Sequence, residues 1–347
     1  AQNITIQEAR ETYHSETDTW FKQSGLTVSL SSPILSALQT GSQMVQAAQN
    51  TSSGRMQALA AASLALAAKD AYDLTKQALT SKNPVDALAP TLNISLGSSE
   101  SESHTTQTAH TAAGSSLQAG GDIKLIATGA GQDSNILIQG SDLSAGNNVT
   151  LLADNKINLI AAQNTASEHS TNESSSSSIG VSINLATGAP SLTLGMSQGE
   201  GQGDGDDLGW SNTHVSAGNT VTMISGGDMN LIGAVVSGHK IIADVGSGYG
   251  GNLNLESLQN KSTYDSDQES SGFNASIGFD FTSFGGSVNA SQSNITSDYA
   301  SVNETSGLKA GDGGFNVTVK GDTRLIGAVI ASTEKALQEN KNSFETG

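Results

Sequence analysis

A cluster of carboxylates at residues 203–207 has the residue types needed to bind a metal ion. Asp204, Asp206 and Asp207 offer the oxygen ligands that Ca²⁺ takes, and Gly203 and Gly205 make the backbone between them flexible. Calcium-binding glycine-rich repeats carry such clusters many times, with an apolar residue at a fixed step. Here the cluster occurs once and without that residue, which favours an acidic surface turn. We retain the three aspartates as candidate calcium ligands and name no other metal ligand.

Two carboxylate pairs have the residue types for glycan cleavage. Asp204 with Asp206, and Asp265 with Asp267, are two residues apart, so each pair lies on one face if its segment is a strand. Paired carboxylates can act as acid and base at a glycosidic bond. Both pairs fall in polar connecting segments, which favours solvated carboxylates instead. A β-helical polysaccharide lyase or hydrolase is therefore the enzyme alternative, and our prediction is that the chain is not an enzyme.

The sequence offers no candidate residues for metalloprotease, serine-hydrolase or cysteine-based catalysis. The six histidines are scattered, at positions 14, 104, 110, 169, 214 and 239, and no pair has the spacing of a metalloprotease helix. Serine is abundant, but no Gly-x-Ser-x-Gly joins a strand to a helix. The chain has no cysteine, which excludes disulfides, thiol nucleophiles and Cys-ligated metals. We therefore expect no catalytic residues and no cofactor.

The charge balance excludes a further class of partner. Among 347 residues, 33 are acidic and 15 basic, and the formal net charge is −18. Such a chain repels phosphates, so we predict that it does not bind nucleic acid. Its longest apolar stretch, residues 58–68, is too short to cross a bilayer. It has no initiator Met or signal peptide, and we expect an internal piece of a longer protein.

The elements that must position these residues recur along the chain. Leu117–Gly120 reads Leu-Gln-Ala-Gly and returns as Val215–Gly218 and Leu308–Gly311, at offsets of 98 and 93 residues. Each copy precedes two short strands of period two, and a second Gly turn follows the first two copies 26 and 20 residues later. Short strands and turns at this spacing predict the stacked coils of a parallel β-helix, in which neighbouring coils bury one continuous core.

Two residue types suit the corners and faces of such coils. Glycines recur at the predicted corners, where they supply either positive φ or close approach of neighbouring backbones: Gly120, Gly146, Gly218, Gly238 and Gly311. Asparagines recur beside the predicted strands, where they form side-chain ladders between coils or remain solvated: Asn148, Asn158, Asn230 and Asn254.

Between the coil pairs, the pattern predicts β-hairpins that leave the solenoid and return. In the middle copy, the alternating runs Gly180–Leu185 and Ser191–Gly195 flank a turn that contains glycine. The later copy, Phe273–Phe279 and Ser287–Ala290, has the same plan. The exposed edges of such hairpins would let them pair with one another, and the sequence leaves open whether they do.

The first hairpin carries an insertion. Gly25–Leu30 matches the outgoing strand of the middle copy, but the returning strand, Leu92–Gly97, follows some sixty residues later. Residues 33–89 between them predict two helices: one that begins at Pro33 and ends near Asn50, and an Ala-rich one over residues 55–81. We expect an antiparallel helical hairpin that packs its own Ala and Leu seam, the alternative being a surface for a membrane or a partner.

The predicted organisation is an all-β chain, a right-handed parallel β-helix with protruding β-hairpins and an inserted α-helical hairpin. In order along the chain the expected segments are 1–32, the end of a coil and the first hairpin strand; 33–89, the helical insertion; 90–116, the return strand and connector; 117–165, coils; 166–214, a hairpin extension; 215–260, coils; 261–307, a hairpin extension; and 308–347, a final coil and a truncated end.

Several longer phrases resemble a known family. The segments 215–224, 227–236, 251–260 and 321–330, among them Gly-Asp-Met-Asn-Leu-Ile-Gly-Ala and Gly-Asp-Thr-Arg-Leu-Ile-Gly-Ala, resemble the haemagglutinin repeats of filamentous-haemagglutinin-like exoproteins. These are giant bacterial proteins exported by two-partner secretion, and the chain is most similar to the second repeat region of contact-dependent growth inhibition effectors. The resemblance covers residues 1–32 and 90–330.

The resemblance implies a secreted module on the bacterial cell surface. It implies contact with a target cell's surface or outer membrane during toxin delivery, and a passage through an outer-membrane transporter during export. The alternative function is a passive adhesin shaft. No toxin domain is recognisable in the chain, and its ligand and oligomeric state are left open by the sequence.

Overall fold

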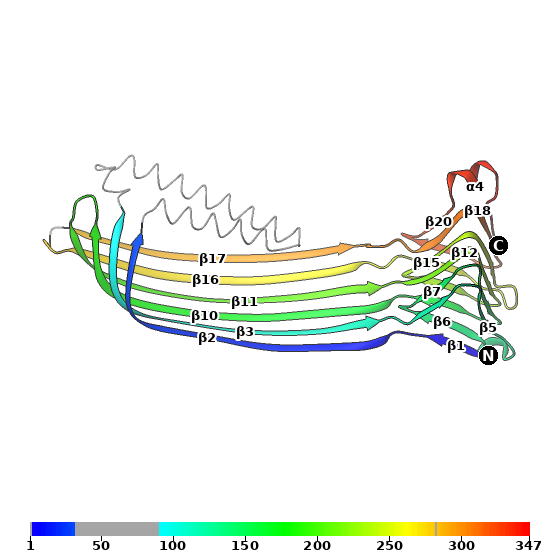
Figure 1. The fold of residues 1–347 in the computed structure, drawn as a ribbon, viewed down its shortest axis with the longest axis horizontal. Coiled ribbons are helices and arrows are strands. Elements are labelled where there is room, and N and C mark those ends of the chain that lie inside the picture. The colour runs from blue at the N-terminus through cyan, green and yellow to red at the C-terminus, as the bar shows by residue number, and fades with distance from the viewer. Residues whose placement is uncertain (1, 32–89, 282) are drawn as a thin grey trace.

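A computed structural model describes residues 2–31, 90–281 and 283–347. These residues form a parallel β-helix at one end and a long antiparallel sheet that projects from it (Figure 1). The prediction of an all-β chain with a parallel β-helix and protruding hairpins is confirmed. The predicted helical hairpin, residues 33–89, lies outside the described residues.

One wall of the β-helix is a six-stranded parallel sheet. Each coil contributes one short strand, and successive strands stack in register, as Met229–Ile232 does on Ile157–Ile160 and beneath Leu253–Glu256. The strands of this wall, in spatial order, are β1 (Asn3–Ile6), β6 (Asn135–Gln139), β9 (Ile157–Ile160), β13 (Met229–Ile232), β15 (Leu253–Glu256) and β19 (Thr323–Ile326).

The other walls belong to a nine-stranded parallel sheet that bends at a corner. In its longer strands the register shifts there, between Ala217 and Thr220 in β12, and in the first coils the chain breaks into two strands at the same place. Its strands are β4 (Ser116–Ala119), β5 (Ile123–Ala127), β7 (Asp142–Ala145), β8 (Val149–Ala153), β12 (Thr213–Ser225), β14 (Ala234–Val245), β18 (Gly307–Val319), β20 (Val329–Ala331) and β21 (Ser343–Thr346). The described residues also include two short helices, η1 (Gly131–Asp133) and α4 (Glu334–Gln338), the second capped by the Thr333 hydroxyl.

The core runs along the axis of the β-helix. Alternate residues of each short strand point inward, as the buried and half-buried pattern of Val149–Ala153 shows. The inward residues of successive coils stack in columns, so a lean supply of apolar side chains is enough. The largest fully buried members are Ile136, Ile138, Leu143, Leu151, Ile157, Leu159, Met223, Met229, Leu231, Ile241, Leu253 and Leu255.

At the bent corner, Gly146 and Gly218, two of the five predicted glycines, allow close approach of neighbouring backbones. None of the five has a positive φ. A Cβ on Gly146 would lie 2.2 Å from the carbonyl oxygen of Gly120, and a Cβ on Gly218 would lie 2.2 Å from the carbonyl oxygen of Gly146. The corners of neighbouring coils therefore stack backbone on backbone, which only glycine permits.

The predicted asparagine ladder forms between coils. The Asn230 side-chain amide donates to Asn158 Oδ1 at 2.7 Å, and the Asn254 amide donates to Asn230 Oδ1 at 2.8 Å. At the corner, Asn219 donates to Asn148 Oδ1 at 3.1 Å. Each rung thereby fixes the register of the next.

The three hairpins pair with one another into a single sheet, which settles what the sequence left open. We call it the lateral sheet. Its strands, in spatial order, are β17 (Phe284–Ser301), β16 (Asn260–Gly278), β11 (Pro190–Ser211), β10 (Ala162–Asn184), β3 (Thr91–Ala113) and β2 (Ala9–Ser31). All neighbours are antiparallel and in unbroken register. The turns of the second and third hairpins, between β10 and β11 and between β16 and β17, lie at the end far from the β-helix (Figure 1).

The lateral sheet gains strands at the same rate as the β-helix gains rungs. Between β4 and β12 the β-helix gains two rungs, and the same stretch of chain supplies the two strands β10 and β11. Between β12 and β18 it gains two more rungs, and β16 and β17 are added. Because parallel and antiparallel strands have nearly the same spacing, about 4.8 Å, each hairpin remains level with its own coils and pairs with the next.

Candidate functional site: the acidic face of the lateral sheet

The two faces of the lateral sheet differ in chemistry. Directly paired residues share a face, so the register assigns every side chain. We call "acidic face" the one formed by the even-numbered residues of β2, β3, β11 and β17 and the odd-numbered residues of β10 and β16. The six strands contain 15 acidic and 3 basic residues, and 12 of the acidic ones lie on this face. The opposite face, the serine face, carries mainly Ser, Thr, Asn and Gly.

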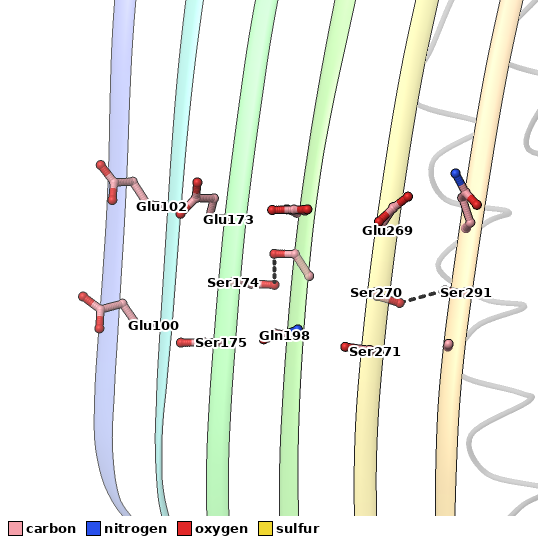
Figure 2. A pocket seen from close by; sticks show the side chains of 14 residues that line it. Glu100, Glu102, Glu173, Ser174, Ser175, Gln198, Glu269, Ser270, Ser271 and Ser291 are labelled. Atoms are coloured by element: carbon pink, nitrogen blue, oxygen red, sulfur yellow. Dashed lines mark hydrogen bonds between the residues drawn. The ribbon is translucent and has the colours of Figure 1, made fainter.

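Four glutamates form a row across the middle of the acidic face. Glu102, Glu173, Glu200 and Glu269 are direct partners on the successive strands β3, β10, β11 and β16. They lie along an open hollow in the sheet, and Figure 2 shows Glu102, Glu173 and Glu269 at one level across the strands. We call these four residues the glutamate row. All four are exposed.

Glu100, two residues from Glu102 along β3, is an acidic neighbour of the row that pairs with a basic side chain. The Trp20 indole N–H donates to Glu100 Oε1 at 3.1 Å, and the Lys22 ammonium donates to Oε2 at 3.2 Å. These bonds, with the charge of Lys22, lower the pKa of Glu100. The glutamate row itself has Trp20 at one end and Gln292 at the other.

Removing the central charge of the row should stabilise the sheet. Glu200 stands directly between Glu173 and Glu269, and like charges directly opposite one another on a sheet are destabilising. We expect Glu200→Gln to raise the midpoint of thermal unfolding at low ionic strength. The gain should shrink in 0.5 M NaCl, because the Debye screening length there is only about 4 Å.

The matched control for this variant is Glu168→Gln. Glu168 lies on the serine face, opposite Gly205 and Gln107, and accepts a bond from Gln107 Nε2 at 2.7 Å. It should gain no stability. A Glu200→Gln midpoint at or below that of the unmodified chain would contradict the repulsive row.

Nearer the β-helix, histidines on the acidic face pair with carboxylates. His104 Nδ1 lies 2.6 Å from Asp18 Oδ1, and this bond raises the pKa of His104. His169 Nδ1 bonds to Asp204 Oδ1 on the neighbouring strand. His14 and His110 bond instead to the Thr108 and Thr12 hydroxyls. Four of the six histidines of the sequence thus gather on one face.

His214 holds a separate cluster where the lateral sheet joins the β-helix. Its Nδ1 lies 2.9 Å from Asp142 Oδ1 and its Nε2 lies 2.8 Å from Glu304 Oε2, which also accepts from the Asn212 amide. Burial favours the neutral imidazole, but the bonds to Glu304 and Asp142 outweigh it and raise the pKa of His214. The pKa of Glu304 is lowered, because the bonds from His214 and Asn212 outweigh the effect of its burial.

The His214 cluster predicts a pH dependence of stability. A raised histidine pKa stabilises the fold below the ordinary value of 6.5, and this contribution is lost as the pH rises through the raised pKa. The lowered pKa of Glu304 contributes above the ordinary 4.5 and is lost as the pH falls through the lowered value. We therefore expect His214→Gln to reduce the thermal midpoint more at pH 5.5 than at pH 8.5.

The control for this measurement is His110→Gln, because the His110 ring bonds to a hydroxyl at 3.2 Å rather than to a carboxylate. Its effect should be the same at both pH values. An effect of His214→Gln that is equal at the two pH values, or larger at pH 8.5, would show that the cluster does not depend on the imidazolium.

The end of the acidic face far from the β-helix is apolar. Alternate residues of all six strands place large apolar side chains there, and many are exposed. We call this area the apolar end. Its members are Leu26, Val28, Leu30, Leu92, Ile94, Leu96, Ile179, Val181, Ile183, Leu192, Leu194, Met196, Phe273, Ala275, Ile277, Phe284 and Val288.

The candidate calcium ligands are split by the strand that carries them. Asp204 and Asp206 lie on the acidic face of β11, and Asp207 lies on the serine face. Asp204 is engaged by His169 and stands opposite Asp265. Among the described residues no group of three or more His, Asp or Glu side chains is arranged to hold a metal ion. A calcium site here stays a prediction.

The candidate glycan-cleaving pairs share a face, as their spacing allowed. Asp265 and Asp267 lie on the acidic face of β16, beside Asp204 and Gln202 of β11. The glutamate row was missed, although the sequence holds a signal for it. Glu102 and Glu200 are 98 residues apart, the offset of the Ala-Gly turns, and Glu173 and Glu269 are 96 apart. Offsets close to the repeat length predict equivalent places in successive repeats.

Comparison with known proteins places these features in a family. A family model described as "Hemagglutinin repeat" matches residues 94–270 and 265–339. The chain is 37% identical, over 99% of its length, to a protein named Deoxyribonuclease CdiA from Dickeya dadantii (strain 3937). It is 37% identical, over 94% of its length, to one named tRNA nuclease CdiA from Escherichia coli (strain NC101), and 34% identical to a Deoxyribonuclease CdiA from Yersinia pseudotuberculosis.

The chain spans a small part of these relatives, 10% of the first two and 30% of the third. No solved structure matches it. No helix in the described part of the chain has the length and apolarity needed to cross a bilayer.

Proposed function

Because the chain belongs to the hemagglutinin-repeat family, in the repeat region of CdiA-like secreted exoproteins of the cell surface, we propose that it contacts the target cell during toxin delivery and has no catalytic activity of its own. The nuclease names of the relatives describe whole proteins, of which this chain matches between 10% and 30%. The β-helix serves as a rigid shaft, and the lateral sheet presents the contact surface.

The observation that supports this proposal is the projecting, exposed end of the lateral sheet. Its turns lie far from the β-helix (Figure 1), and they present Leu185, Phe279 and Phe281 with 52%, 53% and 74% of their surface exposed. Exposed apolar residues gathered at one extremity mark a surface for a protein or a lipid. An outer membrane on the target cell offers both, and is the partner we propose.

Export is the second interaction we propose. We propose that the chain passes unfolded through an outer-membrane transporter. The absence of cysteine suits such a passage, and so does a charged fraction of 14%, below the usual value of about 25%. The chain then gains its structure coil by coil, since each coil contacts only its neighbours.

The proposal is tested by flotation of the purified chain with outer-membrane vesicles from Gram-negative cells. We expect the unmodified chain to float and the variant Phe279→Ser/Phe281→Ser to lose about tenfold in binding, as apolar anchors of an interface do. The matched control is Tyr249→Ser/Leu337→Ser, two exposed apolar residues on the β-helix, which should bind normally.

Two results would contradict target contact through the lateral sheet. Equal binding of the two double variants would place the contact elsewhere. No flotation of the unmodified chain would favour the passive adhesin shaft. The glycan-cleaving alternative is addressed by a substrate screen at several pH values with calcium, in which we expect no product.

A further inference from the structure

The two edge strands of the lateral sheet have the features of strands that pair with another strand. Among the described residues, β2 and β17 each have one neighbour in that sheet. They are 23 and 18 residues long, contain no proline, and pair with their neighbours without a bulge. Soluble proteins usually protect such edges with short strands, bulges, prolines or charges, yet β17 holds a single charged residue, Asp298. Its edge therefore suits an incoming strand.

The register of the sheet fixes how the two edges would meet. Residues at one level across the six strands form a row, as Trp20 of β2 and Gln292 of β17 do at the two ends of the glutamate row. If β17 of one copy pairs with β2 of a second copy at the same level, the two end residues of every row become direct partners.

The apolar side chains of the two edges are complementary in this register. On the acidic face, Leu26 would lie opposite Gly286, which leaves room for it. The residues that flank Gly286 on this face are Phe284 and Val288, so Leu26 would enter the gap between them. In the single chain Leu26, Phe284 and Val288 are 70%, 73% and 79% exposed. Pairing of the edges would therefore bury the most exposed apolar residues of both.

The charged residues of the two edges also fit. Asp298 would face His14, and Lys22 would face the uncharged Ala290. No like charges become direct partners between the two strands in this register. The rest of the net charge of −18 acts over longer distances, where salt screens it.

The ends of the β-helix match in the same arrangement. β1, β4 and β5 are the outermost strands at one end, and β19, β20 and β21 at the other. A second copy stacked on the first would continue the buried columns, with Ile6 on Leu325 and Leu125 on Phe344. Hairpins follow β1, β9 and β15 but not β6, β13 and β19, so placing β1 of the second copy on β19 also continues their alternation.

We propose that copies of this chain associate head to tail, with β2 of one copy paired to β17 of the next and the ends of their β-helices stacked. The contact is heterologous, because two different edges meet, so a third copy adds in the same way. The apolar ends of successive copies then form one band, and their hairpin turns reach a target as a row. Several turns bound together hold more firmly than those of one copy, which goes beyond the single-copy contact proposed above.

Cross-linking of two single-cysteine variants tests the pairing, since the chain has no cysteine of its own. Thr19→Cys and Ser293→Cys lie in one row on the serine face, at opposite edges of the sheet. They are about 24 Å apart within one copy and about 5 Å apart between paired copies. We expect a short bifunctional thiol reagent to cross-link a mixture of the two variants into a dimer, and neither variant alone. The control mixture, Thr27→Cys with Ser293→Cys, is displaced by about 27 Å along the strands and should not react.

A matched pair of substitutions at one position tests the register in the full chain. Ala290→Lys opposes Lys22 of the next copy, whereas Ala290→Glu pairs with it. We expect sedimentation equilibrium to show association weakened about tenfold by Ala290→Lys and unchanged or strengthened by Ala290→Glu. The net charge of the chain acts in the opposite sense, because the Lys variant is the less negative of the two.

Three results would overturn the head-to-tail pairing. They are an unmodified chain that stays monomeric as its concentration is raised, a cross-linked dimer from either cysteine variant alone, and stronger association of Ala290→Lys than of Ala290→Glu. Circular dichroism of each variant shows that its strand content is retained, and the cross-linking decides the matter if a variant at position 290 fails to fold.

Discussion

Leu231→Ala is expected to lower the free energy of unfolding by about 2–5 kcal/mol, the cost of a cavity in a close-packed core. Leu231 is fully buried in β13, and it stacks between Leu159 of β9 and Leu255 of β15. The column passes through the middle of the β-helix, and each coil contacts only its neighbours. A cavity there weakens two interfaces between coils, so we expect a large loss in a urea titration.

The matched control is Leu325→Ala, in the same column. Leu325 pairs with Leu255 from the terminal strand β19, but 45% of it is exposed. Its truncation should cost less than about 1 kcal/mol, in the range of surface substitutions. Equal losses for the two variants would mean that the column is not a core.

Gly218→Ala is expected to cost about 1–3 kcal/mol, because the added methyl group overpacks the corner. A Cβ at Gly218 would lie 2.2 Å from the carbonyl oxygen of Gly146, which is backbone and cannot rotate away. The φ of Gly218 is not positive, so the whole effect comes from contact between coils. The same titration measures it.

Gly120→Ala is the control for the corner. Gly120 is at the equivalent corner of the first coil, and an added Cβ there would meet nothing within 4 Å. We expect its stability to be unchanged or slightly increased, as replacing a flexible glycine restricts the unfolded chain. A destabilisation equal to that of Gly218→Ala would point to backbone conformation rather than stacking.

The β-helix could be predicted from the sequence because its signals are local and repeated. Strands such as Val149–Ala153 alternate buried and half-buried residues, and the Ala-Gly corners return at a nearly constant offset. The asparagine ladder could be predicted as one of two alternatives. Whether Asn230 stacks or is solvated depends on the register between coils, which no single coil contains.

The lateral sheet could be predicted only in part. The alternating runs Gly180–Leu185 and Ser191–Gly195 indicated a hairpin, but β10 and β11 extend far beyond them through Ser-rich and Gly-rich stretches. Those stretches have no hydrophobic period, since both of their faces are polar, so period-based prediction reads them as connectors. These stretches form strands because β10 pairs with β3 on one side and β11 pairs with β16 on the other. Such pairing requires three successive repeats, so no single repeat predicts it.

The candidate site, too, could be predicted only where its residues are close in sequence. The sequence pointed to Asp204, Asp206 and Asp207 because they are adjacent in the chain, and the strand separates them onto two faces. It passed over the glutamate row because its members are far apart in the chain, and the sheet makes them neighbours. Proximity in the lateral sheet is set by the repeat offset rather than by sequence distance.

The central feature of this structure is the pairing of hairpins from successive repeats into a single sheet. A short bifunctional thiol reagent applied to Thr193→Cys/Ser276→Cys tests it, because these residues are direct partners between β11 and β16, with Cβ atoms about 5 Å apart. We predict efficient cross-linking within one chain, and none for Thr193→Cys/Ser270→Cys, where the second residue is displaced by about 20 Å along β16. Failure of the first pair to cross-link, or equal yields from the two pairs, would contradict the lateral sheet.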